Sequence, residues 1–270
     1  MIPSISSSII ALEGKGIANS GNSCYMAATI QGLLQVSEIN KKICEADVQA
    51  LGDLAPFQFL KLTLSPLFGT MEPKRALTTS ETEEIRTFFR NNGWQPKNPY
   101  NQIEDPANFL RFFLSLSQQP TFAVSPRLHK KALNHDYLLS IPARTLNHPT
   151  SLQDLVTTYR LSPETIPELL PVVIDGRTME GMSKNREKIF PSQQLTMSLQ
   201  GDKEEHVLYD LSAVIVYLGG ERTGGHYLTY VPEEDAWVEY NDSSVTRYVQ
   251  SKSVEETIEE HSYIYFYSRV

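Results

Sequence analysis

The 270-residue sequence predicts an α+β fold, in which a mostly helical N-terminal part precedes a mostly antiparallel C-terminal sheet. Two observations lead to this prediction. In the first 170 residues, apolar side chains recur at three- or four-residue intervals, which is the period of a helix. After Pro171 the apolar segments become short and alternating, and turn residues separate them, as in a meander of strands. We expect one domain over residues 1–270, with a helical part at about 14–165 and a sheet-rich part at about 166–270.

Five helices are expected, and they begin near residues 24, 53, 80, 105 and 151. Asn22 or Ser23 can cap the first helix. Ser80 and Glu83 have the spacing of a capping box at the start of the third. Asp105 begins the fourth and is followed by proline, which is favoured at the first helical position. The 35 residues between the fourth and fifth helices contain four prolines and have no predicted element.

The C-terminal part predicts a series of strands that pair mostly with their neighbours in sequence. The expected strands cover about 172–174, 195–199, 207–218, 226–231, 236–240, 245–249 and 263–267. A short acidic helix at about 254–260 precedes the last of them, and residues 176–190 are expected to form a loop.

Charge and cysteine content exclude several classes of protein. The 24 basic and 32 acidic residues give a net charge of −8, which argues against nucleic acid or a membrane surface as a partner. Two cysteines, Cys24 and Cys44, are too few for a disulfide framework or a four-thiolate zinc site. We therefore expect no metal and no cofactor. The scarce cysteines predict a reducing compartment, cytoplasmic or nuclear, and the lack of a long apolar run argues against a membrane span. We also expect a monomer.

Cys24 is the first candidate for chemistry, because it follows the turn residues 20–23 and begins a helix. There the helix dipole favours the reactive thiolate, and Gly21 permits a tight turn that presents the thiol. The amide of Asn19 could donate to an oxyanion formed beside the thiol. The alternatives are a buried small apolar residue for Cys24 and a turn-stabilising amide for Asn19.

His226 is the second candidate, and the other five histidines lie in unremarkable settings. Two glycines precede it, and an aromatic strand follows. A strand–turn–strand hairpin would bring His226 beside Asn241, so that Asn241 or Asp242 holds one imidazole nitrogen and the other faces a thiol. The order Cys, His, Asn/Asp is that of papain-like cysteine proteases. The alternative is an ordinary hairpin with a flexible loop.

Together these segments resemble the ubiquitin-specific protease family of papain-like deubiquitinases. Residues 16–26 (GIANSGNSCYM) resemble the cysteine box of the family, and Gln31 follows them. Residues 209–217 and 224–230 (GGHYLTY) resemble its histidine box, and residues 237–245 (WVEYNDSSV) resemble the segment with the third triad member. The resemblance implies a papain-like fold with a helical thumb-like part packed on a palm-like sheet.

The resemblance also implies a role for each matching residue. Cys24 matches the nucleophile, His226 the general base and Asn241 the residue that orients it. Asn19 matches the oxyanion-hole asparagine, and Asp242 matches an acidic position that assists the histidine or the oxyanion. A substrate channel is implied between the loops 176–188 and 218–225, with these channel residues: Gly224, Gly225, Tyr227, Trp237 and Tyr240.

The sequence departs from the family pattern at three points. Ala27 stands where an asparagine is frequent, and Asn108 replaces the glutamate of the QDAxEFL-type box. The paired CxxC motifs of the zinc-binding fingers region are missing, so we expect the fingers to be reduced or absent.

The implied function is hydrolysis of isopeptide or peptide bonds after the C-terminal Gly-Gly of ubiquitin or a ubiquitin-like modifier. The expected partners are that modifier and the proteins that carry it. Three alternatives remain open at this point: a weakly active or inactive ubiquitin-binding module, a protease for another modifier such as SUMO, and an acyltransferase or transglutaminase-like enzyme. The source is equally open, and a secreted microbial effector would act in the host cytosol.

Overall fold

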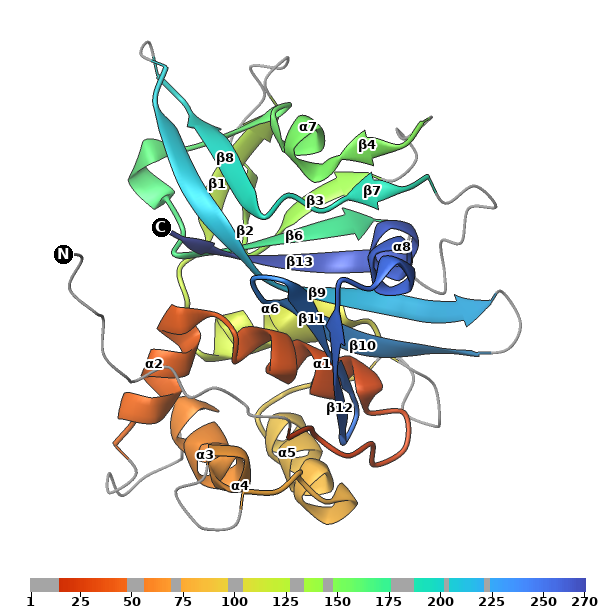
Figure 1. The fold of residues 1–270 in the computed structure, drawn as a ribbon. Coiled ribbons are helices and arrows are strands. Elements are labelled where there is room, and N and C mark those ends of the chain that lie inside the picture. The colour runs from red at the N-terminus through yellow and green to blue at the C-terminus, as the bar shows by residue number, and fades with distance from the viewer. Residues whose placement is uncertain are drawn as a thin grey trace, which may run out of the picture.

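The computed structural model describes residues 15–47, 56–68, 74–96, 104–126, 134–142, 148–175, 187–201, 204–220 and 224–270. In these residues a group of helices packs against one face of a large sheet (Figure 1). The helices before the first strand are α1 (Cys24–Leu33), α2 (Ser37–Glu45), α3 (Pro56–Thr63), α4 (Ser65–Phe68), α5 (Thr79–Asn91) and α6 (Pro106–Leu116). Residues 53–55 of the second predicted helix lie outside the described residues.

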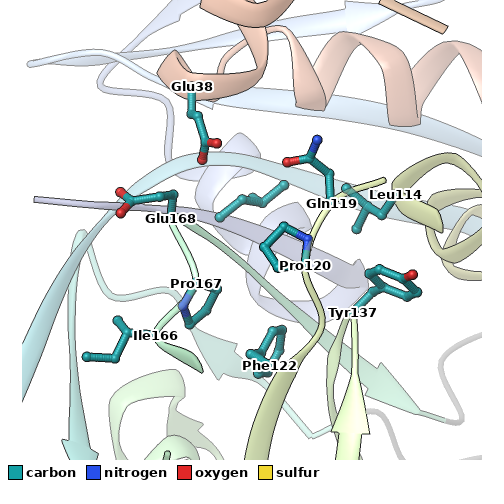
Figure 2. Close-up of a pocket in the computed structure, with 10 residues that line it drawn as sticks. Glu38, Leu114, Gln119, Pro120, Phe122, Tyr137, Ile166, Pro167 and Glu168 are labelled. Atoms are coloured by element: carbon teal, nitrogen blue, oxygen red, sulfur yellow. The ribbon is translucent and has the colours of Figure 1, made fainter. Parts of the chain in front are cut away.

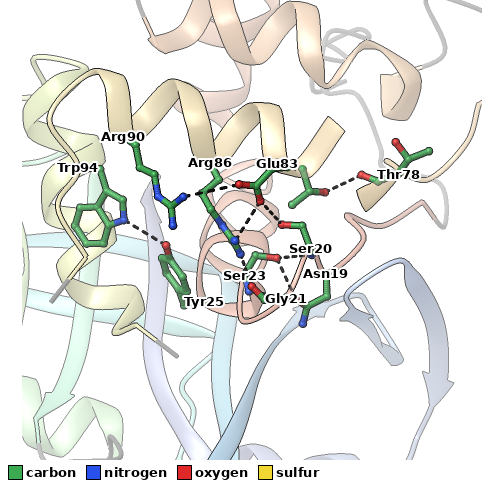
Figure 3. Close-up of polar contacts among 11 residues, drawn as sticks. Asn19, Ser20, Gly21, Ser23, Tyr25, Thr78, Glu83, Arg86, Arg90 and Trp94 are labelled. Atoms are coloured by element: carbon green, nitrogen blue, oxygen red, sulfur yellow. Dashed lines mark hydrogen bonds and ion pairs between the residues drawn. The ribbon is translucent and has the colours of Figure 1, made fainter. Parts of the chain in front are cut away.

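Side-chain caps fix where two of these helices begin. The Asp105 carboxylate accepts a hydrogen bond from the Ala107 N–H at 2.8 Å, which confirms the predicted start of α6. Helix α5 begins one residue earlier than predicted, because the capping box is formed by Thr78 and Glu81 rather than by Ser80 and Glu83. Glu83 is thereby free of the cap and faces the segment before α1 (Figure 3).

The large sheet has eleven strands among the described residues. Eight of them follow the order β12-β11-β10-β9-β8-β5-β1-β2, and β13 pairs with β9 and β6, while β3 pairs with β6. The strands that match the sequence prediction are β6 (Leu169–Asp175), β8 (Gln194–Leu199), β9 (His206–Gly220), β10 (Gly224–Pro232), β11 (Ala236–Asn241), β12 (Ser244–Val249) and β13 (Ser262–Arg269). From β8 to β12 each strand pairs antiparallel with the next, which confirms the predicted meander.

The structure adds short strands to the part of the chain for which the sequence predicts helices. These are β1 (Phe122–Pro126), β2 (Asn134–Asp136), β3 (Leu139–Pro142), β4 (Thr150–Ser151) and β5 (Tyr159–Leu161). They are two to five residues long, and β3 and β5 find parallel partners far along the chain, in β6 and β8. Such strands carry too few residues to show a period, so local pattern could not reveal them.

The remaining elements complete the described fold. They are α7 (Leu152–Val156), the 3₁₀ turn η2 (Pro163–Thr165), β7 (Ile189–Phe190) and α8 (Lys252–His261). The prediction of a loop over 176–190 is wrong at its last two residues, which form β7 by pairing with a distant segment. Ser151 caps α7 by accepting from the Asp154 N–H at 3.0 Å. Strands β4 and β7 form a separate parallel pair. No helix in the described part of the chain combines the length and the apolar composition needed to cross a membrane.

Alternation along the strands divides the core into two layers. In β13, Ile264 and Phe266 pack toward the helices α1–α6, whereas Tyr265 and Tyr267 pack on the opposite face with α7 and α8. Every residue of α1 is buried, because this helix lies between the sheet and the other helices (Figure 1). The Thr229 hydroxyl donates to the Ala28 carbonyl at 2.8 Å and ties α1 to β10. The N-terminus of α1 is therefore held beside the strands that carry the predicted histidine and asparagine.

Candidate active site

Cys24 is the first residue of α1 and is 2% exposed. The segment before it, residues 19–23 and called the cysteine loop below, turns sharply. Gly21 and Asn22 both have left-handed backbone conformations, with φ of 83° and 52°. A glycine adopts this conformation without steric cost, whereas an asparagine tolerates it better than most residues. The turn allows the chain to enter α1 with the thiol at the very start of the helix.

Hydrogen bonds within the cysteine loop fix this turn. The Asn19 Oδ1 accepts from both the N–H and the hydroxyl of Ser23, each at 3.1 Å. The Ser23 Oγ accepts from the Ser20 N–H at 2.8 Å. Ser23 occupies the N-cap position as predicted, but its hydroxyl bonds inside the loop and makes no bond to the first turn of α1. The Asn19 carbonyl oxygen is thus fully engaged, and its amide group is directed out of the loop.

The histidine half of the site is built on the β10–β11 ladder. Thr229 and Tyr240 are opposite each other in this antiparallel pair, so the strand ends that carry His226 and Asn241 lie side by side. The Asn241 Oδ1 lies 2.8 Å from the His226 Nε2. Because the amide oxygen is only an acceptor, Nε2 carries the proton in this bond. The other ring nitrogen, Nδ1, is left for the thiol.

The environment of His226 favours the imidazolium form. Hydrogen bonding with the Cys24 side chain is the largest cause that raises the pKa of His226, to about 9, and burial opposes it. The Asn241 hydrogen bond and the negative charges of Cys24 and Asp242 also raise this pKa. A thiolate beside an imidazolium is the resting pair of a thiol nucleophile. The two predicted reactive residues therefore lie close enough for the Cys24 side chain to have the largest influence on the pKa of His226.

Asp242 links the two halves of the site. Its Oδ2 lies 3.9 Å from the His226 Nε2 and accepts from the Asn19 Nδ2 at 3.3 Å. Burial raises the pKa of the Asp242 carboxyl, while the charge of His226 and the bond from Asn19 oppose that rise. The five predicted catalytic residues therefore form one cluster, in which Asp242 contacts both the histidine and the amide predicted to hold the oxyanion.

The backbone of Asp242 is fixed from the opposite side. Its carbonyl oxygen accepts from the Ile17 N–H at 2.9 Å and from the Gln31 Nε2 at 3.1 Å. A side chain at Gly16 would place its Cβ 2.1 Å from this same carbonyl oxygen. Gly16 is therefore required for the approach of the N-terminal segment to the β11–β12 turn, and Gln31 of α1 secures that turn. Sequence reasoning did not assign these two roles.

The residues predicted to line a channel have different surroundings. Tyr227 and Tyr240 are buried in the core layer that contains α1, and Trp237 is buried on the opposite face of the sheet. A Cβ at Gly225 would lie 2.0 Å from the Tyr217 hydroxyl, whereas Gly224 has open space beside it. Most of the two predicted channel loops, residues 176–186 and 221–223, lies outside the described residues. The channel roles stay predictions.

A pocket elsewhere in the fold does not share this chemistry. Figure 2 shows it between α2, the end of α6 and the start of β6, with a mostly apolar lining. Its carboxylates are paired, Glu38 with Lys42 and Glu168 with Arg269. The pocket contains no thiol or imidazole among its lining residues. In the described residues, no three His, Cys, Asp or Glu side chains gather in a way that could hold a metal ion.

The cluster has the parts needed for acyl transfer by a thiol. A nucleophile lies beside a base, one amide orients the base, and a second amide lies in the loop that precedes the helix of the nucleophile. Three further residues support this cluster, and the sequence did not single them out as functional. They are Ser23, which is adjacent to the cysteine, and Glu83 and Arg86 of α5. The last two contact the cysteine loop from 63 and 65 residues away in sequence, so no local signal could have found them.

Comparison with known proteins gives the same family over nearly the whole chain. A family model described as ubiquitin carboxyl-terminal hydrolase matches residues 15–267. Ubiquitin carboxyl-terminal hydrolase 3 of Homo sapiens is 40% identical over 63 residues, which are 23% of this chain and 11% of that protein. Ubiquitin carboxyl-terminal hydrolase A of Dictyostelium discoideum is 37% identical over 76 residues, which are 28% of this chain and 8% of that protein. The matches thus span about a tenth of the length of these curated relatives.

Solved structures show the same fold. The SAGA Ubp8/Sgf11/Sus1/Sgf73 DUB module is similar over 100% of this chain and 70% of that chain, with a TM-score of 0.69 and 16% identity. The same module bound to ubiquitin aldehyde covers 100% of this chain and 72% of that chain, with a TM-score of 0.65 and 15% identity. This likeness confirms the predicted α+β, papain-like fold.

Proposed function

The chain belongs to the ubiquitin carboxyl-terminal hydrolase family, and from this premise we propose that it is a thiol-dependent deubiquitinase. It hydrolyses isopeptide or peptide bonds after the C-terminal Gly-Gly of ubiquitin. One observation carries the proposal: Cys24 contacts His226, which Asn241 holds, while Asp242 contacts both His226 and Asn19. A module that only binds ubiquitin would not need this complete arrangement.

Acylation begins with the Cys24 thiolate. Its sulfur attacks the carbonyl carbon of the terminal glycine, and the carbonyl electron pair moves onto oxygen. The second N–H of the Asn19 amide and the backbone N–H of Cys24 donate to this oxyanion. When the intermediate collapses, the C–N bond breaks and the lysine amine leaves with a proton from the His226 imidazolium. A thioester between Cys24 and ubiquitin remains, with His226 neutral.

In deacylation His226 acts as a base instead of an acid, and water is the nucleophile. His226 takes a proton from a water molecule, whose oxygen attacks the thioester carbonyl. The same two donors stabilise the second oxyanion. The C–S bond then breaks and the thiolate–imidazolium pair is restored, while ubiquitin leaves as the carboxylic acid, which loses its proton to solvent. Asn241 keeps the ring oriented through both steps, because its bond to Nε2 leaves Nδ1 facing the sulfur.

Two features support ubiquitin as the substrate. The net charge of −8 favours a basic partner, and the tail of ubiquitin before its Gly-Gly contains arginine. The similar DUB module has been solved with ubiquitin aldehyde, a form of ubiquitin with an electrophilic C-terminus.

This chain would act in a reducing compartment, where its thiol stays reduced. It would also bind the body of ubiquitin without zinc-binding CxxC motifs, since its two cysteines form none.

A ubiquitin probe with a C-terminal electrophile tests the proposal. Wild-type protein is expected to form one covalent adduct, which peptide mapping places on Cys24. The C44A variant is the matched control, since it removes the other cysteine and should react like the wild type. An inactive module would bind the probe without forming an adduct.

Parallel probes built on SUMO and other modifiers test the choice of substrate. Reaction with one of these and not with ubiquitin would replace the substrate while keeping the chemistry. Absence of any adduct at Cys24 would contradict the proposed function.

A further inference from the structure

The cysteine loop contains two consecutive left-handed residues, Gly21 and Asn22, directly before the nucleophile segment. The conformation is free for glycine but costs energy for asparagine, and it persists only where the surroundings hold it. The bonds of Asn19 and Ser23 hold the loop from within. They do not contact the Gly21 carbonyl, which lies at the centre of the turn.

Helix α5 supplies that missing contact. The Arg86 Nη2 donates a hydrogen bond to the Gly21 carbonyl oxygen, and the Arg86 Nη1 pairs with the Glu83 Oε2 at 3.1 Å. The same Glu83 oxygen accepts from the Ser20 hydroxyl at 3.1 Å. Figure 3 shows these three side chains between α5 and the loop. The loop is thus bound at two adjacent residues by one acidic and one basic side chain, which also bind each other.

The geometry of Arg86 suits this task. Its side chain is only 13% exposed, although the Gly21 whose carbonyl it contacts is an exposed residue. The planar guanidinium offers several donors in a fixed arrangement, and two of them are used here for different partners. An ammonium group at the end of a flexible chain would not fix the two partners relative to each other.

We propose that Glu83 and Arg86 of α5 are positioning residues for the reaction. By fixing the Gly21–Asn22 peptide, they set the direction of the Cys24 N–H and the position of its sulfur against His226. They touch neither substrate nor reacting atoms. The proposal rests on the proposed function in one respect only, namely that Cys24 is the nucleophile.

Arg90 provides a matched control on the same helix. It also approaches Glu83, with its Nη1 3.8 Å from the Glu83 Oε1, but its side chain is 43% exposed. Loss of Arg90 removes a charge of the same sign beside the same carboxylate. Any effect found for R86M and absent from R90M therefore belongs to the contact with the loop.

The test uses R86M, E83Q and R90M, with two rate measurements. The first is kcat and KM for a ubiquitin C-terminal fluorophore substrate. The second is the rate of Cys24 alkylation by iodoacetamide in a C44A background, which needs no ubiquitin. We expect R86M to lower kcat by between about tenfold and a hundredfold with KM changed less than about twofold, the range found when a reacting group is slightly misplaced. Alkylation should slow as well, and R90M should match the wild type in both rates.

E83Q is the milder variant, since its amide still accepts from Ser20 but no longer carries the charge that holds Arg86. It should shift kcat and alkylation in the same direction by a smaller factor, and it decides the question if R86M does not fold. A role in stability alone would lower the melting temperature and leave both rates of the folded protein unchanged. Rates in R86M and E83Q equal to those of R90M would overturn the proposal. If ubiquitin is not a substrate at all, the alkylation rates still decide it.

Discussion

The two halves of the site are held in place in different ways. His226 and Asn241 stand at the ends of neighbouring strands, and the backbone ladder of β10 and β11 brings them together. Cys24 follows a loop with two left-handed residues, which is held by side chains from the loop itself and from α5. In the β10–β11 ladder, many backbone hydrogen bonds together hold His226 and Asn241 in place. The cysteine loop depends on a few side chains, so single substitutions should affect it more.

Asp242 is where the two halves meet. Its carboxylate contacts His226 and Asn19, and its backbone carbonyl accepts bonds from the N-terminal segment and from Gln31 of α1. Its φ of 53° shows that the β11–β12 turn also uses a left-handed residue at this point. Strand β11 thus ends next to a left-handed residue at the point where the chain contacts the cysteine loop.

Replacing the nucleophile has the largest expected effect. C24A should lower kcat/KM for a ubiquitin C-terminal fluorophore substrate by at least roughly 10⁴-fold, as expected when a covalent nucleophile is removed. Binding of ubiquitin should persist, because Cys24 is buried and contributes little contact surface. Turnover that survives in C24A would contradict the assignment of both halves of the site, whereas C44A should behave like the wild type.

A change in the cysteine loop comes next. N19A removes one oxyanion donor and also the acceptor of two Ser23 bonds, so it should lower kcat by roughly 10²–10³-fold. The measurement is steady-state kinetics on the same substrate. The N19D variant retains the acceptor for Ser23 but lacks the amide that donates to the oxyanion and to Asp242, so it tests the loss of these two donor contacts together. An unchanged kcat in N19A would remove Asn19 from the mechanism.

A change in the hairpin half should cost less. N241A removes one hydrogen bond to a charged ring, which corresponds to roughly a 10–100-fold loss of kcat/KM, and H226A should cost more. Asp242 lies 3.9 Å from the same ring nitrogen and can partly replace the amide. The N241A/D242A double variant should therefore be worse than N241A alone. Equal rates in the single and double variants would show that Asp242 does not compensate.

The pH dependence of kcat/KM also tests the hairpin half, and here the expected effect is the smallest. Since the pKa of His226 is raised to about 9, the imidazolium that protonates the leaving amine persists up to that pH and is lost above it. The kcat/KM for an isopeptide-linked substrate should therefore decline as pH rises through about 9. In N241A the decline should begin at lower pH, because the Asn241 bond is one of the causes that raise this pKa. A decline at the same pH in both proteins would contradict that cause.

The sequence predicted the hairpin half better than the cysteine half, for physical reasons. Alternation and turn residues show where β9 to β12 begin and end, and antiparallel neighbours then place His226 beside Asn241. The resemblance to a known family supplied the roles of Cys24 and Asn19. Nothing local in the sequence showed that Ser23 bonds within the loop, or that Gly16 makes room for the Asp242 carbonyl.

In the rest of the fold, too, the sequence predicted elements that have local signals and missed those that depend on distant partners. Helix α6 was placed by its Asp-Pro start, because a cap is a local signal. Strands β3 and β5 were missed, because each is only three or four residues long and pairs with a strand about 30 or more residues away. The contacts of Glu83 and Arg86 with the cysteine loop are of the same long-range kind.

The contact between Cys24 and His226 is the central claim, and an NMR titration of the histidine rings tests it most directly. The sequence contains six histidines, and H226Q identifies the signal of His226 by its loss. We expect a midpoint of about 9 for His226 in the wild type and in C44A. In C24A the largest cause of the raised pKa is gone, so the midpoint should fall toward the ordinary value of 6.5. The same midpoint in C24A and in the wild type would contradict the thiol–imidazole pair.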